Sequence, residues 1–426
     1  MDHPTANPTS AVTAGTPPGI DLLSARVASI AISPTIAMSQ RAAAMRAAGV
    51  DVIGMSLGEP DFKTPTRIVE AAHAAAQAGF TRYTAPDGAP VIKNAVRQKL
   101  LRDNRLDYAT GEIHVASGAK QVIYNAFAAT LDRGDEVIVI TPCWVSYMDT
   151  VLFCGGVPVM VPTAAANGFL PDAAALRAAI TPRTKWVLLN SPGNPTGAVY
   201  PAGLLRELAA ALADFPRVLV MADEIYEHLV FDPAGHVSIL EVAPQLRDRV
   251  LLVNGVSKTY SMTGWRIGFA AGPAWLIEAM GCVQSQTAGN SCSVAQAAAA
   301  EALTGDQSEI ASWVRMFRSR RDRAISVLSE SRRITVTCPA GAFYLYVDVG
   351  PCIGARTPQG AVLRDDTAVV EYLLIEARVA TVPGVAFAMS PFVRLSFALD
   401  EERVEEGCRR IVAALDRLTP ATGAAA

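Results

Sequence analysis

The sequence predicts an α/β fold, in which a large domain holds a mostly parallel sheet between helices and a smaller α+β domain follows it. Short apolar runs, several rich in β-branched residues, recur through the middle of the chain, and fully buried parallel strands have this composition. Helical patterns such as residues 203–213 separate several of these runs, which predicts βαβ units with helices on both sheet faces. Near residues 304–306 the pattern changes to a long Arg-rich helix followed by isolated strands, which indicates the second domain.

Length and composition are typical of a globular protein with much buried surface. The chain has 426 residues, enough for two or three domains, of which 51% are hydrophobic and 18% charged. Its net charge of −3 gives no basis for binding nucleic acid or an anionic membrane. No apolar run is long enough to cross a bilayer, and residues 1–20 lack the basic start and apolar centre of a signal peptide.

Cysteine and histidine usage gives no support for disulfides or metal ligation. The seven cysteines are odd in number and form no Cys-x-x-Cys pair, so we expect a reducing, cytoplasmic compartment. The five histidines form no metal-binding motif, and we therefore expect no metal site.

The N-terminal part of the chain is predicted to be a tail followed by a broken helix. Residues 1–19 are rich in Pro, Thr, Ala and Gly and are predicted to be disordered. A helical pattern over 20–48 is interrupted at Ser33 and Pro34, because a proline disfavours the helical conformation in the residue before it. A short strand is expected at 50–55.

The remaining elements follow from the same patterns. Strands of the large sheet are expected at 136–141, 157–161, 186–190, 218–222, 250–254 and 268–271. Later elements are expected as strands at 342–349 and 392–397 and a closing helix at 401–418. The predicted organisation is a tail (1–19), an N-terminal segment joining the small domain (20–65), a large cofactor-binding domain (66–305), a small domain (306–418) and a second tail (419–426).

The segment 255–266, between two predicted strands, contains the most informative lysine of the chain. Small residues around Lys258 allow its partial desolvation, which lowers the pKa of its amine and frees it to form a Schiff base. Ser257 and Arg266 are placed to hold an anion beside it. A lysine, a carbonyl and a phosphate together indicate pyridoxal phosphate. Taken alone, a Ser-Lys pair is more often part of a surface loop.

Polar residues also follow a predicted strand at 190–197, with the sequence Asn-Ser-Pro-Gly-Asn-Pro-Thr-Gly. Ligands of open α/β sheets bind at the carboxyl ends of strands, so this rigid loop is a candidate for presenting the Asn194 amide to a ligand. The alternative is a tight connection between two elements, which Asn-Pro and Pro-Gly pairs also form.

The next strand ends in Asp223-Glu224-Ile225-Tyr226. Asp223 and Tyr226, three positions apart, are able to face one site at a strand end. A carboxylate there would keep a pyridine nitrogen protonated, and a phenol would bond the ring oxygen. The alternative is a helix-capping Asp followed by a packed Tyr.

An extended segment meets a predicted helix at Ser117-Gly118-Ala119-Lys120. The free N–H groups and positive dipole end of such a helix start suit a phosphate. The alternative is an ordinary capped helix start.

Two further residues are candidates for ligand contact. Trp144 follows a strand end and would stack on a planar ring, although a Trp at such a junction is more often core. Arg394 lies among apolar residues of a predicted strand and would bind a substrate carboxylate, unless it forms an internal salt bridge.

Each of these motifs is weak alone, but their order is specific. Asn-Pro-Thr-Gly at 194–197, Asp-Glu-Ile-Tyr at 223–226, Ser-Lys at 257–258, Gly-Trp-Arg at 264–266 and then Arg394 closely resemble fold-type I, class I pyridoxal-phosphate aminotransferases. The resemblance covers about residue 20 to residue 418 and implies the seven-stranded type of sheet of that fold. Segments 58–62, 118–121 and 144–147 resemble the bacterial aspartate aminotransferase subgroup.

The resemblance implies roles for matching residues. Lys258 would be the Schiff-base lysine and the acid/base of catalysis, assisted by Asp223 at the pyridine nitrogen and Tyr226 at the ring oxygen. Further cofactor contacts are implied for Asn194, Trp144, Ser257, Arg266, the N–H groups of Ala119 and Lys120, and Tyr83 of a neighbouring subunit. Substrate contacts are implied for Arg394, Gly58, Trp144, Asn194, Lys120, Ser33 and Thr35. The role of Tyr83 implies a homodimer with shared active sites.

The implied reaction is a ping-pong transamination between an amino acid, above all aspartate or glutamate, and 2-oxoglutarate or oxaloacetate. Lys120, Ser33 and Thr35 match the side-chain carboxylate binders of the subgroup. Ala31 stands where some members that also use prephenate carry Lys, which gives less support for prephenate. The alternatives are an aminotransferase for aromatic, prephenate-like or secondary-metabolic substrates, and a pyridoxal-phosphate lyase or non-catalytic regulator.

Overall fold

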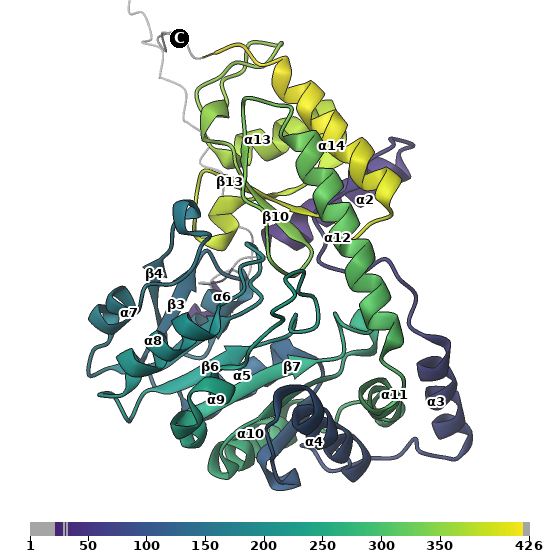
Figure 1. Ribbon diagram of the computed structural model, residues 1–426, viewed down its shortest axis with the longest axis vertical. Helices are drawn as coiled ribbons and strands as arrows, with labels where there is room; N and C mark the ends of the chain where they lie inside the picture. Colours follow the sequence, from purple (N-terminus) through teal and green to yellow (C-terminus); the bar gives the residue numbers. More distant parts are fainter. Residues whose placement is uncertain (1–21, 29, 31–32, 421–426) are drawn as a thin grey trace, which may run out of the picture.

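The computed structural model describes residues 22–28, 30 and 33–420. It has a large lower domain and a smaller upper domain, and the long helix α12 (Ser308–Leu328) extends from one to the other (Figure 1). The predictions made for residues 1–19, for Ala31 and for 421–426 lie outside the described residues.

The large domain is built on one seven-stranded sheet with the order β2-β8-β7-β6-β5-β3-β4. Strand β8 pairs antiparallel with both of its neighbours, and all other pairs are parallel. This confirms the predicted mostly parallel sheet. The strands are β2 (Ile113–Ala116), β3 (Glu136–Thr141), β4 (Val157–Pro162), β5 (Thr184–Asn190), β6 (Leu219–Asp223), β7 (Val250–Gly255) and β8 (Gly268–Ala271).

All six strands predicted for this sheet are present, two of them with the predicted ends and four with an end that differs by one or two residues. Strand β6 reaches Asp223 because that residue still pairs with Asn190 of β5. Strand β2 was expected only as an extended segment. Its four residues are all buried, but His114 interrupts the apolar run by which a buried strand is recognised.

Helices cover both faces of the sheet, and alternate strand residues belong to two separate cores. One core packs Val139 and Met221 against α5, α6 and α10, while the other packs Ile138 and Val220 against α4, α8 and α11. This is the two-residue period of a strand buried on both sides. The helices are α3 (Thr66–Gln77), α4 (Pro90–Asn104), α5 (Ala119–Thr130), α6 (Ser146–Phe153), α7 (Ala173–Ala179), α8 (Ala202–Leu212), α9 (Ile239–Val242), α10 (Ala274–Thr287) and α11 (Ser293–Thr304).

The small domain contains a four-stranded antiparallel sheet of order β12-β13-β10-β9. Helices α12 and α14 pack together beside this sheet. The elements are β9 (Thr335–Val336), β10 (Tyr344–Asp348), α13 (Asp366–Tyr372), β11 (Val379–Ala380), β12 (Val382–Pro383), β13 (Phe392–Ser396) and α14 (Glu401–Asp416). Thr419 exchanges two backbone hydrogen bonds with Arg356, so the predicted start of the C-terminal tail at 419 is too early.

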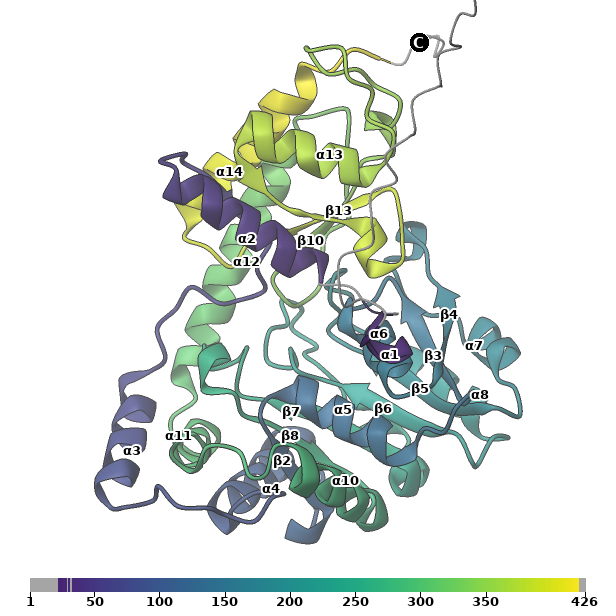
Figure 2. The same ribbon diagram turned by 180° about the vertical axis from the view of Figure 1, so that it is seen from behind.

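The N-terminal segment lies against the small domain (Figure 2). Its elements there are α2 (Pro34–Ala47) and β1 (Ile53–Gly54), whereas α1 (Ala25–Ala28) lies beside α6 of the large domain. Pro34 is the first residue of α2, which agrees with the predicted interruption of the helix. Strand β1 pairs with β11, and Ala42 and Val52 pack against Leu374 and Ala380.

Candidate active site

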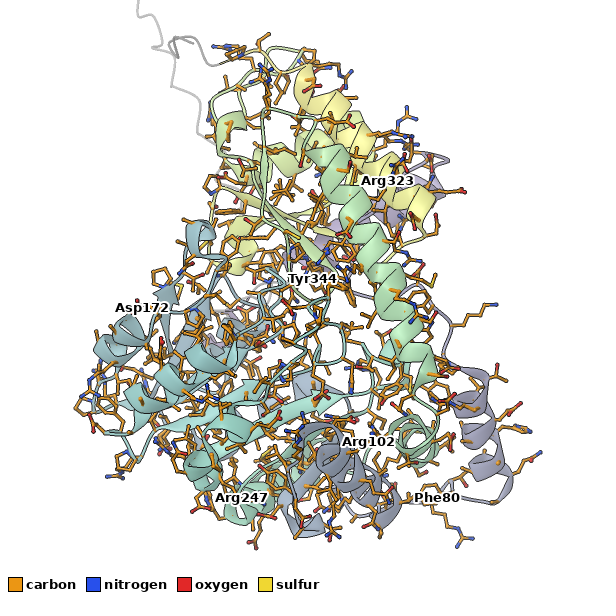
Figure 3. All side chains as sticks on the ribbon, viewed as in Figure 1. Phe80, Arg102, Asp172, Arg247, Arg323 and Tyr344 are labelled. Atoms are coloured by element: carbon orange, nitrogen blue, oxygen red, sulfur yellow. The ribbon has the colours of Figure 1, made fainter. Side chains whose placement is uncertain are left out.

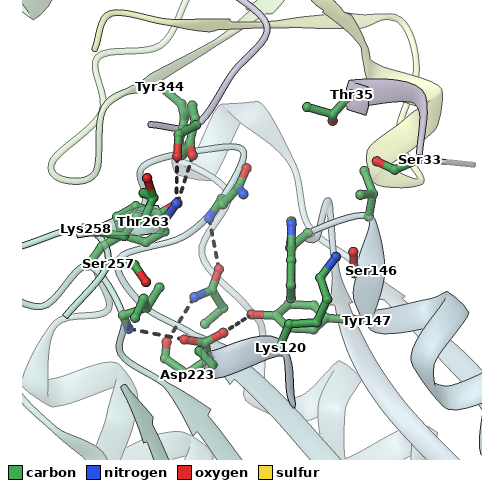
Figure 4. A pocket seen from close by; sticks show the side chains of 18 of the residues that line it. Ser33, Thr35, Lys120, Ser146, Tyr147, Asp223, Ser257, Lys258, Thr263 and Tyr344 are labelled. Atoms are coloured by element: carbon green, nitrogen blue, oxygen red, sulfur yellow. Dashed lines mark hydrogen bonds between the residues drawn. The ribbon is translucent and has the colours of Figure 1, made fainter. Parts of the chain in front are cut away.

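A cavity of about 320 Å³ lies at the carboxyl ends of the parallel strands, where the large domain faces the small one (Figure 4). Thirteen of the fourteen site residues predicted from the sequence line this cavity. These thirteen are Ser33, Thr35, Gly58, Ala119, Lys120, Trp144, Asn194, Asp223, Tyr226, Ser257, Lys258, Arg266 and Arg394. Tyr83, the remaining predicted residue, does not line the cavity, and its side chain is 98% exposed in this single chain.

Lys258 lies in the turn between β7 and β8, and its ammonium donates a 2.7 Å hydrogen bond to the Gly58 carbonyl. Burial lowers the pKa of Lys258 to about 8, and the positive charges of Arg394 and Arg266 act in the same direction. A larger fraction of this amine is therefore unprotonated near neutral pH than in an exposed lysine. An unprotonated amine is the form that attacks a carbonyl carbon.

Asp223 is the last residue of β6 and is 3% exposed. Its Oδ2 accepts a 2.6 Å hydrogen bond from the Tyr147 hydroxyl, and its Oδ1 accepts one of 3.2 Å from the Ile225 N–H. Burial raises the pKa of Asp223 to about 6, and these hydrogen bonds oppose that rise. A buried carboxylate of this kind gains most from a cationic N–H partner, which would favour its ionised form.

Tyr226 forms a buried hydroxyl pair with Tyr344, with 2.8 Å between the two oxygens. Burial raises the pKa of Tyr226 well above its ordinary value, so the phenol is protonated. Figure 3 places Tyr344, from β10, at the junction of the two domains. The pair therefore joins the end of the large sheet to the small domain.

Arg394, on β13, is 2% exposed and reaches across to the large domain. It donates to Asn194 Oδ1 at 2.9 Å and to the Ser56 carbonyl at 2.5 Å, while its Nε has no partner. Among the described residues no carboxylate lies within 4.0 Å of it, so the internal salt bridge considered from the sequence is absent there. A buried guanidinium paired only with neutral oxygens is prepared to receive an anion.

An anion cradle lies beside Lys258 at the start of α5. Gly118, at φ 91°, precedes the helix and has no capping side chain, so the N–H groups of Ala119 and Lys120 are available. Arg266 donates to the Ser117 carbonyl at 3.3 Å. A Cβ at Gly118 would overlap this guanidinium, which shows how closely the glycine backbone approaches it.

The outer wall of the cavity is formed by Lys120, Trp144, Ser33 and Thr35. The Lys120 ammonium lies 5.0 Å from the centre of the Trp144 ring. Burial lowers the pKa of Lys120, the nearby Arg266 lowers it further, and Asp149 opposes both effects. In Figure 4, Lys120 lies on the opposite side of the pocket from Lys258.

Eight residues that line the cavity had no role assigned from the sequence, and three of them bond the predicted residues. Tyr147 and Asn190 lie inside motifs that sequence reasoning quoted, but only the fold shows that both bond Asp223, Tyr147 at the carboxylate and Asn190 at the carbonyl oxygen at 2.9 Å. Tyr344 is 118 residues from its partner Tyr226, and an apolar strand position carries no signal of that contact.

A group of possible metal ligands, Glu224, Glu227 and His236, lies outside the lining of the cavity. The Glu227 carboxylate already bonds Lys99 and accepts from Asn254 at 2.7 Å. These contacts satisfy its charge without an ion, and the expectation of no metal site stays a prediction.

Comparison with known proteins identifies the class to which this geometry belongs. The sequence profile described as "Aminotransferase class I and II" matches residues 50–411. The chain belongs to this family, which confirms the resemblance, and it is a pyridoxal-phosphate-dependent aminotransferase.

Three named aminotransferases are similar to this chain over nearly its whole length. The chain is 49% identical to an aspartate/prephenate aminotransferase of Cereibacter sphaeroides, over 92% of this chain and 98% of the relative. It is similar to the crystal structure of the aspartate aminotransferase of Rhizobium meliloti, with a TM-score of 0.90, 46% identity and coverage of 93% and 99% of the two chains. An aspartate aminotransferase of Thermus thermophilus with maleate gives a TM-score of 0.85 at 41% identity, over 92% and 99% of the chains.

Proposed function

We propose that this enzyme transfers an amino group between aspartate or glutamate and the matching 2-oxo acids in two half-reactions. The charge balance of the cavity carries the proposal. Four cationic side chains line it, and within the described part of the chain none has a carboxylate within 4.0 Å, whereas Asp223 is the one carboxylate among the lining residues. The four are Lys120, Lys258, Arg266 and Arg394. Such an excess suits a dianionic phosphate together with a dicarboxylate.

The residues present fit pyridoxal phosphate, which when bound supplies an electron sink for the carbanion at the amino-acid Cα. The α5 start with Ser257 and Arg266 would hold the phosphate, at a cradle where the glycine leaves no room for a side chain. Asp223 would hold the proton on the ring nitrogen, since its raised pKa is relieved by a cationic partner.

The remaining ring contacts follow from the cavity walls. Tyr226 and Asn194 would hold the ring hydroxyl oxygen, and Trp144 would lie on the ring face. Lys258 would bind the cofactor's carbonyl carbon and, once the substrate amine displaces it, move a proton between Cα and C4′. Its lowered pKa keeps the amine competent for that transfer.

Two groups of side chains would divide the substrate between them. Arg394 would receive the α-carboxylate as a bidentate pair, with its free Nε contributing a donor that no described residue uses. Lys120, Ser33 and Thr35 would receive the side-chain carboxylate on the other side of the cavity.

The active unit is proposed to be a homodimer, to which Tyr83 contributes from one subunit to the other's phosphate. The loop that carries Tyr83 is held in place by the buried Gln296, whose amide donates to Thr84 Oγ1 at 3.2 Å and accepts from the Ala89 N–H at 2.8 Å. A side chain held on a fixed loop and 98% exposed suits a contact with a second chain. Light scattering that gives a monomer with full activity would contradict this.

A cytoplasmic location is proposed from the cysteines. All seven are free thiols, which suits a reducing compartment. Within the residues that the structure describes, no helix is long and apolar enough to span a bilayer.

The second candidate substrate class is prephenate-like or aromatic, and it is favoured by the name of the Cereibacter sphaeroides relative, an aspartate/prephenate aminotransferase. The cavity does not exclude a ring, because Trp144 and Tyr344 provide aromatic surface there.

Single-turnover absorbance distinguishes these candidates. Protein loaded with pyridoxal phosphate is mixed with aspartate or, separately, with phenylalanine, and loss of the lysine-bound cofactor band is followed. In a third experiment, protein loaded with pyridoxamine phosphate is mixed with prephenate, and recovery of that band is followed. We expect rapid conversion by aspartate. A strong preference for the aromatic partner would overturn the dicarboxylate assignment, and no conversion by any donor would overturn the transamination.

A further inference from the structure

A second cavity, of about 480 Å³, adjoins the first one on the side away from Lys258. Five residues line both cavities, so the two cavities adjoin at Ser33, Ile36, Lys120, Ser146 and Arg266. Trp144 lines only the first cavity, and Asp149 lines only the second. The Lys120 ammonium therefore lies at a boundary, with an aromatic face on one side and a carboxylate on the other.

Asp149 has no partner of its own in the described part of the chain. It lies in the first turn of α6, is half-buried, and has no side-chain hydrogen bond or ion pair there. Burial raises its pKa, and the charge that opposes this rise is that of Lys120. The charged residues that line the second cavity are Lys120, Asp149 and Arg266. A small side-chain movement would therefore join the Asp149 carboxylate and the Lys120 ammonium in an ion pair.

Lysine is suited to such a movement, because its ammonium ends a flexible four-carbon stem. With a dicarboxylate in the first cavity, Lys120 has an anion to bind there. With an uncharged side chain in that space, the ammonium would be enclosed next to the Trp144 ring without an anion, which is unfavourable. Turning toward Asp149 removes this penalty and enlarges the room for the substrate.

We infer that Lys120 has two positions and that Asp149 is a specificity-determining residue, which receives the Lys120 ammonium when the donor has an uncharged side chain. The inference rests on the proposed function of the first cavity. Asp149 competes with the substrate carboxylate for Lys120, so it favours uncharged donors and opposes dicarboxylate donors.

Half-reaction kinetics of Asp149→Asn with aspartate and with phenylalanine test the inference in the holoenzyme. The expected result is a fall of about fivefold in kcat/KM for phenylalanine, the size of a partly buried ion pair, while kcat/KM for aspartate stays the same or rises about twofold. Asp149→Glu keeps the charge and should restore the phenylalanine reaction. Glu207→Gln, which removes an exposed carboxylate of α8 that lines neither cavity, is the matched control.

The outcomes separate the two proposals. An unchanged ratio of the two kcat/KM values in Asp149→Asn, or an equal fall for both donors, overturns the role of Asp149 and leaves the proposed function intact. A wild-type enzyme that converts aspartate but never phenylalanine also overturns the inference, since Lys120 would then have no second use. Failure of the wild-type enzyme with both donors overturns the proposed function itself.

Discussion

The inner and outer walls of the active-site cavity differ in how completely the protein satisfies its own side chains. On the inner wall, Asp223, Tyr226 and Arg394 are each at most 3% exposed and bonded to other residues of the chain. On the outer wall, Lys120 is exposed, and the hydroxyls of Ser33 and Thr35 have no hydrogen bond within the described residues. The inner wall is thus built before a ligand arrives, whereas the outer wall is completed by the ligand.

This difference predicts which substitutions lower activity toward every substrate and which lower it only toward some substrates. Buried, mutually bonded groups position one another, so their loss affects every substrate. Exposed groups that act only on a substrate side chain affect only the substrates that carry that group.

The largest effect is expected for Lys258→Ala, at the centre of the inner wall. Loss of the amine that moves the proton should reduce the half-reaction with aspartate by about 10⁴-fold or more. The measurement is single-turnover absorbance, with exposed Lys63→Ala, which does not line the cavity, as the control. More than about 1% residual rate would show that another group moves the proton.

Arg394→Gln should come next. Removing a buried guanidinium that binds the α-carboxylate should lower kcat/KM by about 10²- to 10³-fold for aspartate and phenylalanine alike, since every amino acid carries that group. Equal losses for the two donors support its place on the inner wall. A loss confined to aspartate would show that Arg394 acts on the side-chain carboxylate, which would contradict the distinction between the inner and outer walls.

The pH dependence of stability probes the inner wall without any ligand. The pKa of Asp223 is raised from 3.8 to about 6 in the folded protein, so the folded state binds more protons than the unfolded state between these values. Stability contributed at low pH is therefore lost as pH rises through 6. Urea unfolding of cofactor-free wild type should lose about 1 kcal/mol relative to Asp223→Asn between about pH 5 and pH 7.5. A difference independent of pH would contradict the raised pKa.

Thr35→Val should have the smallest effect and the most selective one. Because Thr35 would contact only the side-chain carboxylate, we expect kcat/KM for aspartate to fall about threefold and that for phenylalanine to stay unchanged. Steady-state assays with both donors measure this. Equal losses would show that the N-terminal segment positions the whole site, which would remove the distinction between the walls.

The sequence was sufficient for those parts of the molecule that depend on local pattern. Buried strands such as 136–141 and glycine-rich strand ends around Lys258 are recognised from consecutive residues, and the carboxyl ends of parallel strands converge on one edge. That rule alone brought Asn194, Asp223 and Lys258 to one cavity.

Contacts between distant elements could not be predicted in this way. Tyr147 supports Asp223 from the first turn of α6, and Tyr344 supports Tyr226 from the other domain, so neither contact leaves a trace in the local sequence. The second cavity is a further example, because Lys120 and Asp149 belong to two helices whose relative position only the fold determines.

The strand order of the large sheet also has a consequence for biosynthesis. Strand β8, the last strand of that sheet along the chain, pairs with β2 on one side and β7 on the other. A nascent chain that ends before Gly268 therefore leaves β2 without a partner and β7 with an open edge, and both strands are mostly apolar. Open apolar edges invite association between chains. Chains that terminate before β8 should therefore aggregate, because the strand that follows the turn carrying the lysine is also the strand that covers both of these edges.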